Sequence, residues 1–245
     1  MKICIAQTKP IKGNVTANIE AHIKFIELAL TLNAEAIFFP ELSLTGYEPE
    51  LARELVTNQN DNRLDIFQQI SDNNNIIIGL GLPIIADSHI RISMIIFEPN
   101  KPRQTYSKQL LHSDEFPYFD NGTEQVIIKT RDANIAPAIC YESLQPTHIK
   151  NAFKLGADVY LASVAKPANG IEKAFEHYPV VAKQYAMPVL MANCVGFCDN
   201  FLSVGQSAVW TKYGKLACQL DDKTEGILIF DTETEVIVSR VLITN

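Results

Sequence analysis

Cys140 follows the apolar segment 134–139 and precedes a turn, so its thiol stands at the end of an expected strand. Free backbone N–H groups are available at such a place, which suits a nucleophile. The attacking species is the thiolate, and because an unperturbed thiol has a pKa of about 8.5, it needs a base or a cation nearby at neutral pH. The alternative is a buried structural cysteine, because free cysteines are often buried. The residues near Cys140 in space must decide between these alternatives.

Two charged residues offer the base and the cation. Glu41 directly follows the apolar segment 36–39 and Pro40, where poor solvation would raise its pKa toward the range useful in acid–base catalysis. Lys108 directly follows the segment 103–107 and, as a fixed cation, would favour the thiolate and stabilise an oxyanion. Taken singly, Glu41 also fits a surface cap and Lys108 a solvated surface lysine. Their functional interpretation therefore requires that the fold bring them to Cys140.

The segments that carry these residues alternate between strand and helix patterns. A helix predicted over residues 14–33 separates two apolar strands, the second of which leads to Glu41. After Cys140, Pro146 and Gly156 bracket another helix. Strands are expected at residues 2–7, 36–39, 76–85, 91–97, 103–107, 126–129, 134–139, 158–163, 188–193, 205–211, 215–220, 226–230 and 236–243.

Two more helices complete the pattern, at residues 64–70 and 170–186, and we expect Pro179 to kink or interrupt the second. Helices that alternate with strands in two halves favour a layered α/β architecture over a barrel. Open α/β sheets place their sites beyond the carboxyl ends of strands, so Glu41 and Cys140 are expected to share one crevice.

These motifs together resemble the nitrilase superfamily of carbon–nitrogen hydrolases, whose catalytic Glu, Lys and Cys follow one another in this order. The glutamate motif is similar to residues 40–47, the lysine motif to residues 106–111 and the cysteine motif to residues 139–142. Further similarity lies at residues 5–7, 156–158, 205–207 and 225–228. The resemblance implies a four-layer α-β-β-α sandwich, in one domain over residues 1–245, that commonly pairs into a homodimer or a higher homo-oligomer.

The same resemblance implies a second glutamate shortly after the lysine. Glu115 matches its usual placement, ahead of Phe116, and Asp114 is the rival. The implied reaction is covalent hydrolysis of a small amide with release of ammonia, without a metal or an organic cofactor. Glu41 would act as base, while Lys108 and the Tyr141 N–H would hold the oxyanion.

The expected substrate-binding residues are Tyr47, Phe116, Tyr141 and Lys166. Three positions depart from the commoner family pattern. No arginine follows Cys140 closely, Gln206 stands where histidine is frequent, and Lys166 stands where an aromatic or small residue is usual. Lys166 either binds a carboxylate of the substrate or is a solvated surface lysine.

Several other functions remain open. Because the chain lacks the long C-terminal extension of many true nitrilases, an amide is a better guess than a nitrile, and N-carbamoyl amino acids come next. Mechanistic rivals are a Cys–His hydrolase and a zinc site, although neither has a recognisable signature. Their candidate residues are His112, His148, His177, Cys194 and Cys198. A different class is a catalytically silent binding protein on the same fold.

Composition limits the partners and the location. With 47% hydrophobic and 20% charged residues, the 245-residue chain can build a sizeable core. A formal net charge of −7 without a basic stripe argues against nucleic acid. The apolar run near the N-terminus is too short for a signal peptide, and no later stretch approaches the roughly 18 residues of a membrane span. Five cysteines without a disulfide spacing agree with a cytoplasmic protein.

Overall fold

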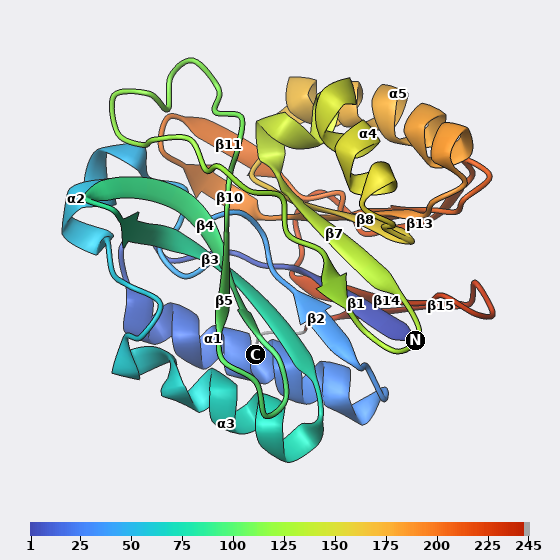
Figure 1. The fold of residues 1–245 in the computed structure, drawn as a ribbon, viewed down its shortest axis with the longest axis horizontal. Coiled ribbons are helices and arrows are strands. Elements are labelled where there is room, and N and C mark those ends of the chain that lie inside the picture. Colours follow the sequence, from blue (N-terminus) through green and yellow to red (C-terminus); the bar gives the residue numbers. More distant parts are fainter. Residues whose placement is uncertain (243–245) are drawn as a thin grey trace.

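Two β-sheets packed face to face form the centre of the computed structural model, which describes residues 1–242 (Figure 1). Helices α1 (Val15–Thr31) and α3 (Asp65–Asn74) cover the outer face of one sheet. Helices α4 (Pro146–Lys154) and α5 (Ala168–Tyr185) cover the outer face of the other. The layers therefore follow the order α-β-β-α, which confirms the fold that the family resemblance implies.

The larger sheet has seven strands in the order β15-β14-β1-β2-β3-β4-β5. The central strands β1, β2 and β3 are parallel, whereas the strands that flank them pair antiparallel. Its strands are β1 (Lys2–Gln7), β2 (Ala36–Phe38), β3 (Ile77–Ala86), β4 (His89–Phe97), β5 (Gln104–Ser107), β14 (Gly226–Asp231) and β15 (Ile237–Val241).

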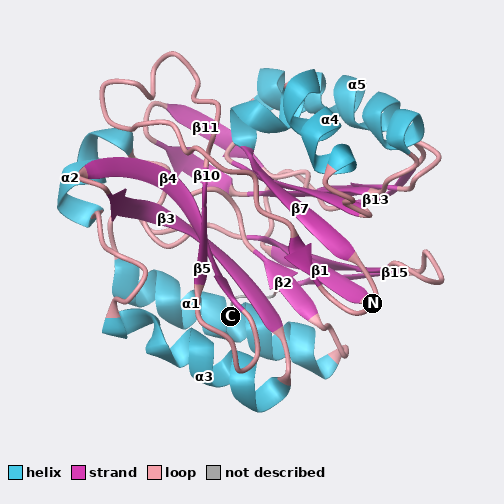
Figure 2. Cartoon of the chain, viewed as in Figure 1, coloured by secondary structure: helices cyan, strands magenta, loops and turns pink. Residues whose placement is uncertain are grey.

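The second sheet has six strands in the order β13-β12-β9-β8-β7-β6, with β7, β8 and β9 parallel (Figure 2). Its strands are β6 (Ile128–Lys129), β7 (Asn134–Ile139), β8 (Val159–Val164), β9 (Val189–Asn193), β12 (Ala208–Trp210) and β13 (Leu216–Gln219). The remaining elements are η1 (Pro49–Leu51), α2 (Ala52–Leu55), η2 (Asn62–Leu64), η3 (Cys140–Leu144) and the hairpin β10 (Val195–Cys198)–β11 (Phe201–Val204).

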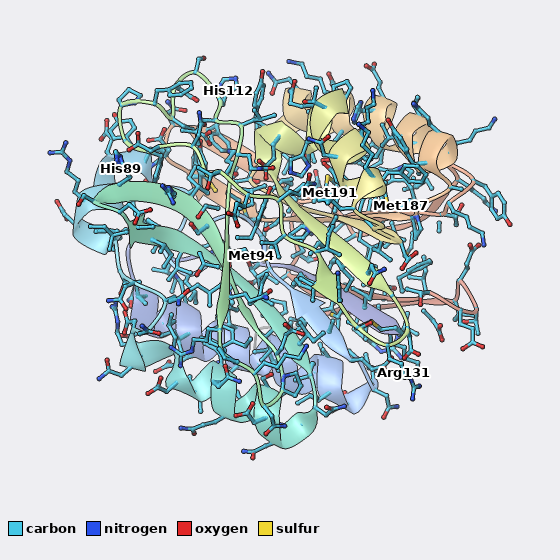
Figure 3. All side chains as sticks on the ribbon, viewed as in Figure 1. His89, Met94, His112, Arg131, Met187 and Met191 are labelled. Carbon is cyan, nitrogen blue, oxygen red and sulfur yellow. The ribbon has the colours of Figure 1, made fainter. Side chains whose placement is uncertain are left out.

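Alternation along the strands divides the apolar side chains among three cores. On β1, Ile3 and Ile5 face the second sheet, whereas Cys4 and Ala6 face the helix layer of α1. Both faces are therefore buried, which explains why this strand is a continuous apolar run. Figure 3 shows the same division on other strands, with Met94 between the sheets and Met191 on the side of α4 and α5.

Each strand predicted from the sequence has a counterpart in the structure, although Ile243 lies outside the described residues. The expectation that Pro179 interrupts its helix is wrong, because α5 runs through it without a break. Ile171, Ala174 and Tyr178 are buried on one face of α5, and this packing against the six-stranded sheet compensates for the N–H that proline lacks. The hairpin β10–β11 was not predicted.

Gly81 on β3 lets the loop that carries Glu41 lie directly against the strand. The Leu44 N–H donates to the Gly81 carbonyl at 3.0 Å, and the Ser43 hydroxyl accepts from the Gly81 N–H at 3.3 Å. A Cβ on this residue would overlap the Leu42 nitrogen and lie 2.6 Å from the Pro40 oxygen. These are backbone atoms that cannot rotate away, so only glycine fits.

We therefore expect Gly81→Ala to lower the free energy of unfolding by about 1–3 kcal/mol, the usual cost of overpacking a close-packed site. Urea unfolding measures this change. Ile85→Ala on the same strand is the control. Ile85 is 46% exposed, so this substitution adds no atom against the Glu41 loop and should lower the free energy of unfolding less. Equal stability of Gly81→Ala and the wild type would contradict the close approach.

Candidate active site

Glu41, Lys108 and Cys140 come together where strands of the two sheets end. Glu41 follows β2 and Lys108 follows β5, both in the seven-stranded sheet, whereas Cys140 follows β7 of the other sheet. The Lys108 ammonium donates to Glu41 Oε1 at 2.8 Å and to Glu115 Oε1 at 2.6 Å. All three charged side chains are buried. The fold thus builds an ion-pair cluster from residues far apart in the chain.

Glu115, and not its rival Asp114, is the second carboxylate of this cluster. Glu115 also accepts from the Tyr47 hydroxyl at 2.9 Å and from the His112 N–H at 2.7 Å. Asp114 is exposed and pairs with the His112 ring at 2.6 Å. Three kinds of donor thus hold Glu115 in place, and Glu115 in turn fixes the position of Lys108.

The cluster holds one cation against two carboxylates in a dry environment. Burial alone would lower the pKa of Lys108, but Glu41 and Glu115 outweigh burial and raise it above its usual value. Burial and the second carboxylate raise the pKa of Glu41, against the opposing effect of Lys108. Glu41 Oε2 is buried and has no hydrogen-bond partner within residues 1–242. Glu41 therefore has a free acceptor atom and an increased affinity for a proton.

Cys140 has a left-handed backbone conformation, with φ of 49°, at the start of η3. Such a conformation is uncommon for a residue with a side chain and is retained where the surroundings impose it. The thiol donates to the Ala165 carbonyl at 3.7 Å. Burial, followed by the negative charge of Glu41, raises the pKa of Cys140 to about 12. The resting group is thus a thiol that must lose its proton to attack.

Glu142 ties the Cys140 turn to the Lys108 loop, a role that the sequence interpretation missed. Its Oε1 accepts from the Ile139 N–H at 2.7 Å, and its Oε2 accepts from the Gln109 N–H at 2.6 Å. The residue three positions before Glu142 is Ile139, whose side chain cannot accept a hydrogen bond, so the sequence has no capping-box motif that could have revealed this role. A buried Tyr106 hydroxyl also donates to Glu142, at 2.5 Å.

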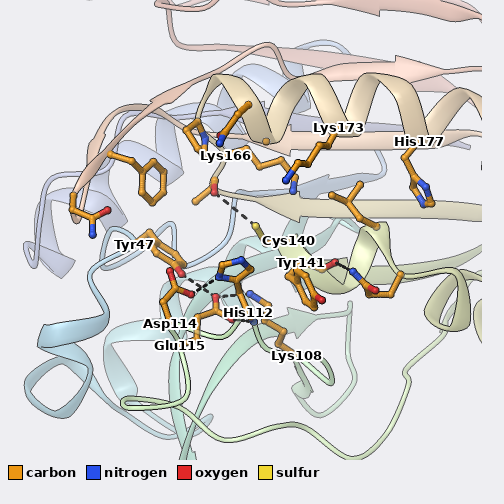
Figure 4. A pocket seen from close by; sticks show the side chains of 18 residues that line it. Tyr47, Lys108, His112, Asp114, Glu115, Cys140, Tyr141, Lys166, Lys173 and His177 are labelled. Atoms are coloured by element: carbon orange, nitrogen blue, oxygen red, sulfur yellow. Dashed lines mark hydrogen bonds and ion pairs between the residues drawn. The ribbon is translucent and has the colours of Figure 1, made fainter.

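A pocket of about 650 Å³ opens over Cys140 (Figure 4). Three of the expected substrate-binding residues, Tyr47, Tyr141 and Lys166, line it, together with Lys108 and Glu115. Phe116 is not among the lining residues and is 58% exposed. The aromatic wall is completed instead by Phe201 of the unpredicted hairpin, whose ring centroid lies 5.7 Å from that of Tyr47.

The histidines offered as rival bases lie in other surroundings. His112 is paired with Asp114, and the buried His148 contacts the hydroxyls of Tyr106 and Tyr160 at 2.8 Å each. His177 lines the pocket, but within residues 1–242 the Cys140 thiol donates to the Ala165 carbonyl and not to this ring.

Neither a metal cluster nor a membrane helix is found within the described range 1–242. No group of three or more His, Cys, Asp or Glu residues there is arranged to hold a metal ion. None of the helices in that range is both long and apolar enough to cross a bilayer.

The α-β-β-α sandwich and the Glu–Lys–Cys cluster at its strand ends are the features by which the chain can be compared with known families. The profile of the family named Carbon-nitrogen hydrolase matches residues 2–239, so the chain belongs to that family.

Curated relatives include the glutamine-dependent NAD(+) synthetase of Acinetobacter baylyi, with 25% identity over 96% of this chain and 44% of the relative. The enzyme of the same name from Aquifex aeolicus is 25% identical over 93% of this chain and 41% of its own length. The chain therefore spans less than half the length of these relatives.

Among solved structures, an amidase from Nesterenkonia sp. AN1 superimposes with a TM-score of 0.84 at 19% identity, covering 94% of this chain and 89% of that one. A glutamine-dependent NAD+ synthetase from Acinetobacter baumannii gives a TM-score of 0.84 at 23% identity, covering 100% of this chain and 48% of that one. At these identities the superpositions establish the shared fold.

The electrostatics of the site predict the pH dependence of Cys140 alkylation by iodoacetamide. Well below the thiol pKa of about 12, the rate should rise roughly tenfold per pH unit, in step with the thiolate fraction. Glu41→Gln removes a negative charge that raises this pKa, so the variant should be alkylated faster than the wild type at pH 8. Intact-mass spectrometry follows the adduct, with Cys140→Ala to identify the site. Slower alkylation of Glu41→Gln would contradict the proposed influence of Glu41 on the thiol.

Proposed function

We propose that this protein hydrolyses the carbon–nitrogen bond of a small amide through a thioester on Cys140 and releases ammonia and a carboxylic acid. The observation that carries the proposal is the buried ammonium of Lys108, held between Glu41 and Glu115 beside the thiol in a pocket. This arrangement supplies a base, an oxyanion donor and a nucleophile without a metal. In a structure of the Nesterenkonia amidase, the acetamide moiety of fluoroacetamide is covalently attached to the active-site cysteine, which supports a nucleophilic cysteine on this fold.

Acylation begins when Glu41 takes the Cys140 proton and the sulfur attacks the amide carbon. The ammonium of Lys108 has three protons, of which Glu41 and Glu115 engage two, so the third is free for the oxyanion. Tyr141 lies in the first turn of η3, where its N–H lacks an intrahelical acceptor, and it supplies a second donor. Glu41 then gives the proton to the leaving nitrogen, and ammonia departs as the thioester forms.

Deacylation uses the same carboxylate. Glu41 accepts a proton from water, the hydroxide attacks the thioester carbon, and the tetrahedral intermediate is stabilised by the same donors. Collapse of this intermediate breaks the carbon–sulfur bond, releases the acid and returns the proton from Glu41 to sulfur. Glu115 keeps Lys108 in place throughout.

Glutamine is a second candidate substrate, and the matched relatives favour it. Their names describe NAD(+) synthetases that depend on glutamine, and this chain aligns with them over almost its whole length. The glutamine side chain ends in a primary amide, which is the bond class that the site fits. In this form of the proposal, the ammonia would pass to a second reaction. Nitriles and N-carbamoyl amino acids are the remaining substrate alternatives, and a homodimer or a higher homo-oligomer is the expected assembly.

An ammonia-release screen over aliphatic amides, glutamine, nitriles and N-carbamoyl amino acids tests the proposal. Cys140→Ala should lower turnover by roughly 10⁴-fold or more, because loss of a covalent nucleophile removes the whole route. Cys218→Ala is the matched control, since Cys218 is a free thiol of intermediate exposure on β13. An acyl adduct on wild-type Cys140 by intact mass would support the thioester.

Full turnover in purified Cys140→Ala would contradict the mechanism. A thiol that resists iodoacetamide, together with no turnover of any substrate, would favour a binding protein on this fold.

A further inference from the structure

Lys166 is a buried lysine in the wall of the pocket. It follows β8, and only 4% of its surface is exposed. Its ammonium has no ion pair and no hydrogen bond with any side chain or carbonyl of residues 1–242, although the side chain lines the pocket (Figure 4). A lysine with so little exposed surface usually has an anionic partner. The pocket side of Lys166 is therefore available to a negatively charged group of a ligand.

The backbone of Lys166 is firmly held, so the side chain starts from a fixed position. Its N–H donates to Asn193 Oδ1 at 2.9 Å, and its carbonyl accepts from the Ser203 hydroxyl at 3.1 Å. The Val204 N–H donates to the same carbonyl at 3.2 Å. These contacts join the end of β8 to β9 and to the hairpin β10–β11, so that the lysine is presented by a rigid frame.

Lys166 lies close to the reacting thiol. Its neighbour Ala165 accepts the hydrogen bond of the Cys140 thiol at 3.7 Å. The positive charge of Lys166 lowers the pKa of Cys140 more than that of Lys108 does, although burial and Glu41 prevail and raise it. A short substrate whose amide carbon sits at Cys140 can thus extend its other end to Lys166.

The charges around the pocket are divided between two walls. Glu41, Glu115 and Lys108 form one side with an excess of one negative charge, and the outer Asp114 is engaged by His112. The opposite wall carries Lys166 and the exposed Lys173 of α5, with no carboxylate among the pocket-lining residues of that wall.

His177, further along α5, belongs to this second wall. Burial, followed by the charge of Lys166, lowers its pKa, and its buried Nε2 has no partner within the described residues. This ring would therefore meet a ligand as a neutral group. An anion would be attracted to the second wall, while the amide carbon would face the first.

We propose that Lys166 binds a carboxylate of the substrate, so that the enzyme prefers ω-monoamides of short dicarboxylic acids over neutral amides of the same length. The proposal rests on the proposed function and specifies its substrate class. An ammonium–carboxylate contact in this dry wall would be a charge-assisted hydrogen bond, which is stronger than a neutral one. Glutamine falls within the class, and comparison with glutaramate, which lacks its amino group, separates the two substrates.

The test compares kcat/KM for glutaramate, L-glutamine and pentanamide, the last being a neutral amide with the same number of carbons. The wild type should prefer a carboxylate-bearing amide over pentanamide. Lys166→Met should reduce kcat/KM for the carboxylate-bearing substrates about 10- to 100-fold more than for pentanamide, as expected when a hydrogen bond to a charged group is lost. This additional loss of kcat/KM for the carboxylate-bearing substrates should appear mainly as a higher KM. Lys166→Arg, which retains the charge, should keep much of the preference.

Lys183→Met is the matched control, because Lys183 is an exposed lysine of the same helix as Lys173 and lies outside the pocket lining. It should leave all three values unchanged. Equal losses on charged and neutral amides in Lys166→Met would overturn the proposal, since they would assign Lys166 to the thiol instead of the substrate. A wild-type preference for pentanamide would overturn it without any variant.

Failure of the proposed function gives a different result, namely no ammonia and no acyl adduct from any of the three amides. If Lys166→Met does not fold, binding of glutaramate to the Cys140→Ala protein at low and high salt replaces it. Tighter binding of glutaramate than of pentanamide, weakened by salt, supports the carboxylate contact, and equal affinities contradict it.

Discussion

The buried ammonium of Lys108, paired with two carboxylates, is the interaction on which the rest of the site depends. A charge removed from water is tolerated only when it is well paired, and removal of one partner from a buried pair costs roughly 3–5 kcal/mol. The surplus of one negative charge also sets the chemistry. Burial, followed by the negative charge of Glu41, raises the pKa of Cys140 to about 12. Burial also raises the pKa of Glu41, and the charge of Glu115 adds to this effect. The thiol is therefore protonated at rest, and Glu41 has the increased proton affinity that the proposed role of base requires.

Several buried hydrogen bonds hold these charges in place across the two sheets. The Ser163 hydroxyl on β8 donates to the Phe39 carbonyl beyond β2 at 2.6 Å, and so links the second sheet to the loop of Glu41. Glu142 links the Cys140 turn to the backbone after Lys108 in the same way. The groups proposed to react are thus positioned by contacts between sheets, and not by the conformation of any one loop.

Local sequence patterns predicted the features that neighbouring residues determine. Apolar runs that end at Glu41 and Cys140 predict strands and the side chains at their ends, and α1 follows from the spacing of its apolar residues. These patterns failed where contacts between distant residues determine the structure. Packing keeps α5 intact through Pro179, and the hairpin β10–β11 has no clear alternation, because Gly196 interrupts it and Phe197 is 82% exposed. The burial of Lys166, and the pairing of Lys108 with a residue 67 positions away, cannot be read from any local window.

The division of the site between the sheets has a consequence for assembly of the molecule. Glu41, Lys108 and Glu115 all follow strands of the seven-stranded sheet, whereas Cys140 follows a strand of the other sheet. The thiol therefore lies beside the charged cluster only because the two sheets are packed together. The dehydration of three charges must then be compensated by the apolar side chains that meet between the sheets. The apolar surface between the sheets thus has two tasks, since it brings the charged cluster to the thiol and compensates for the loss of water around these charges.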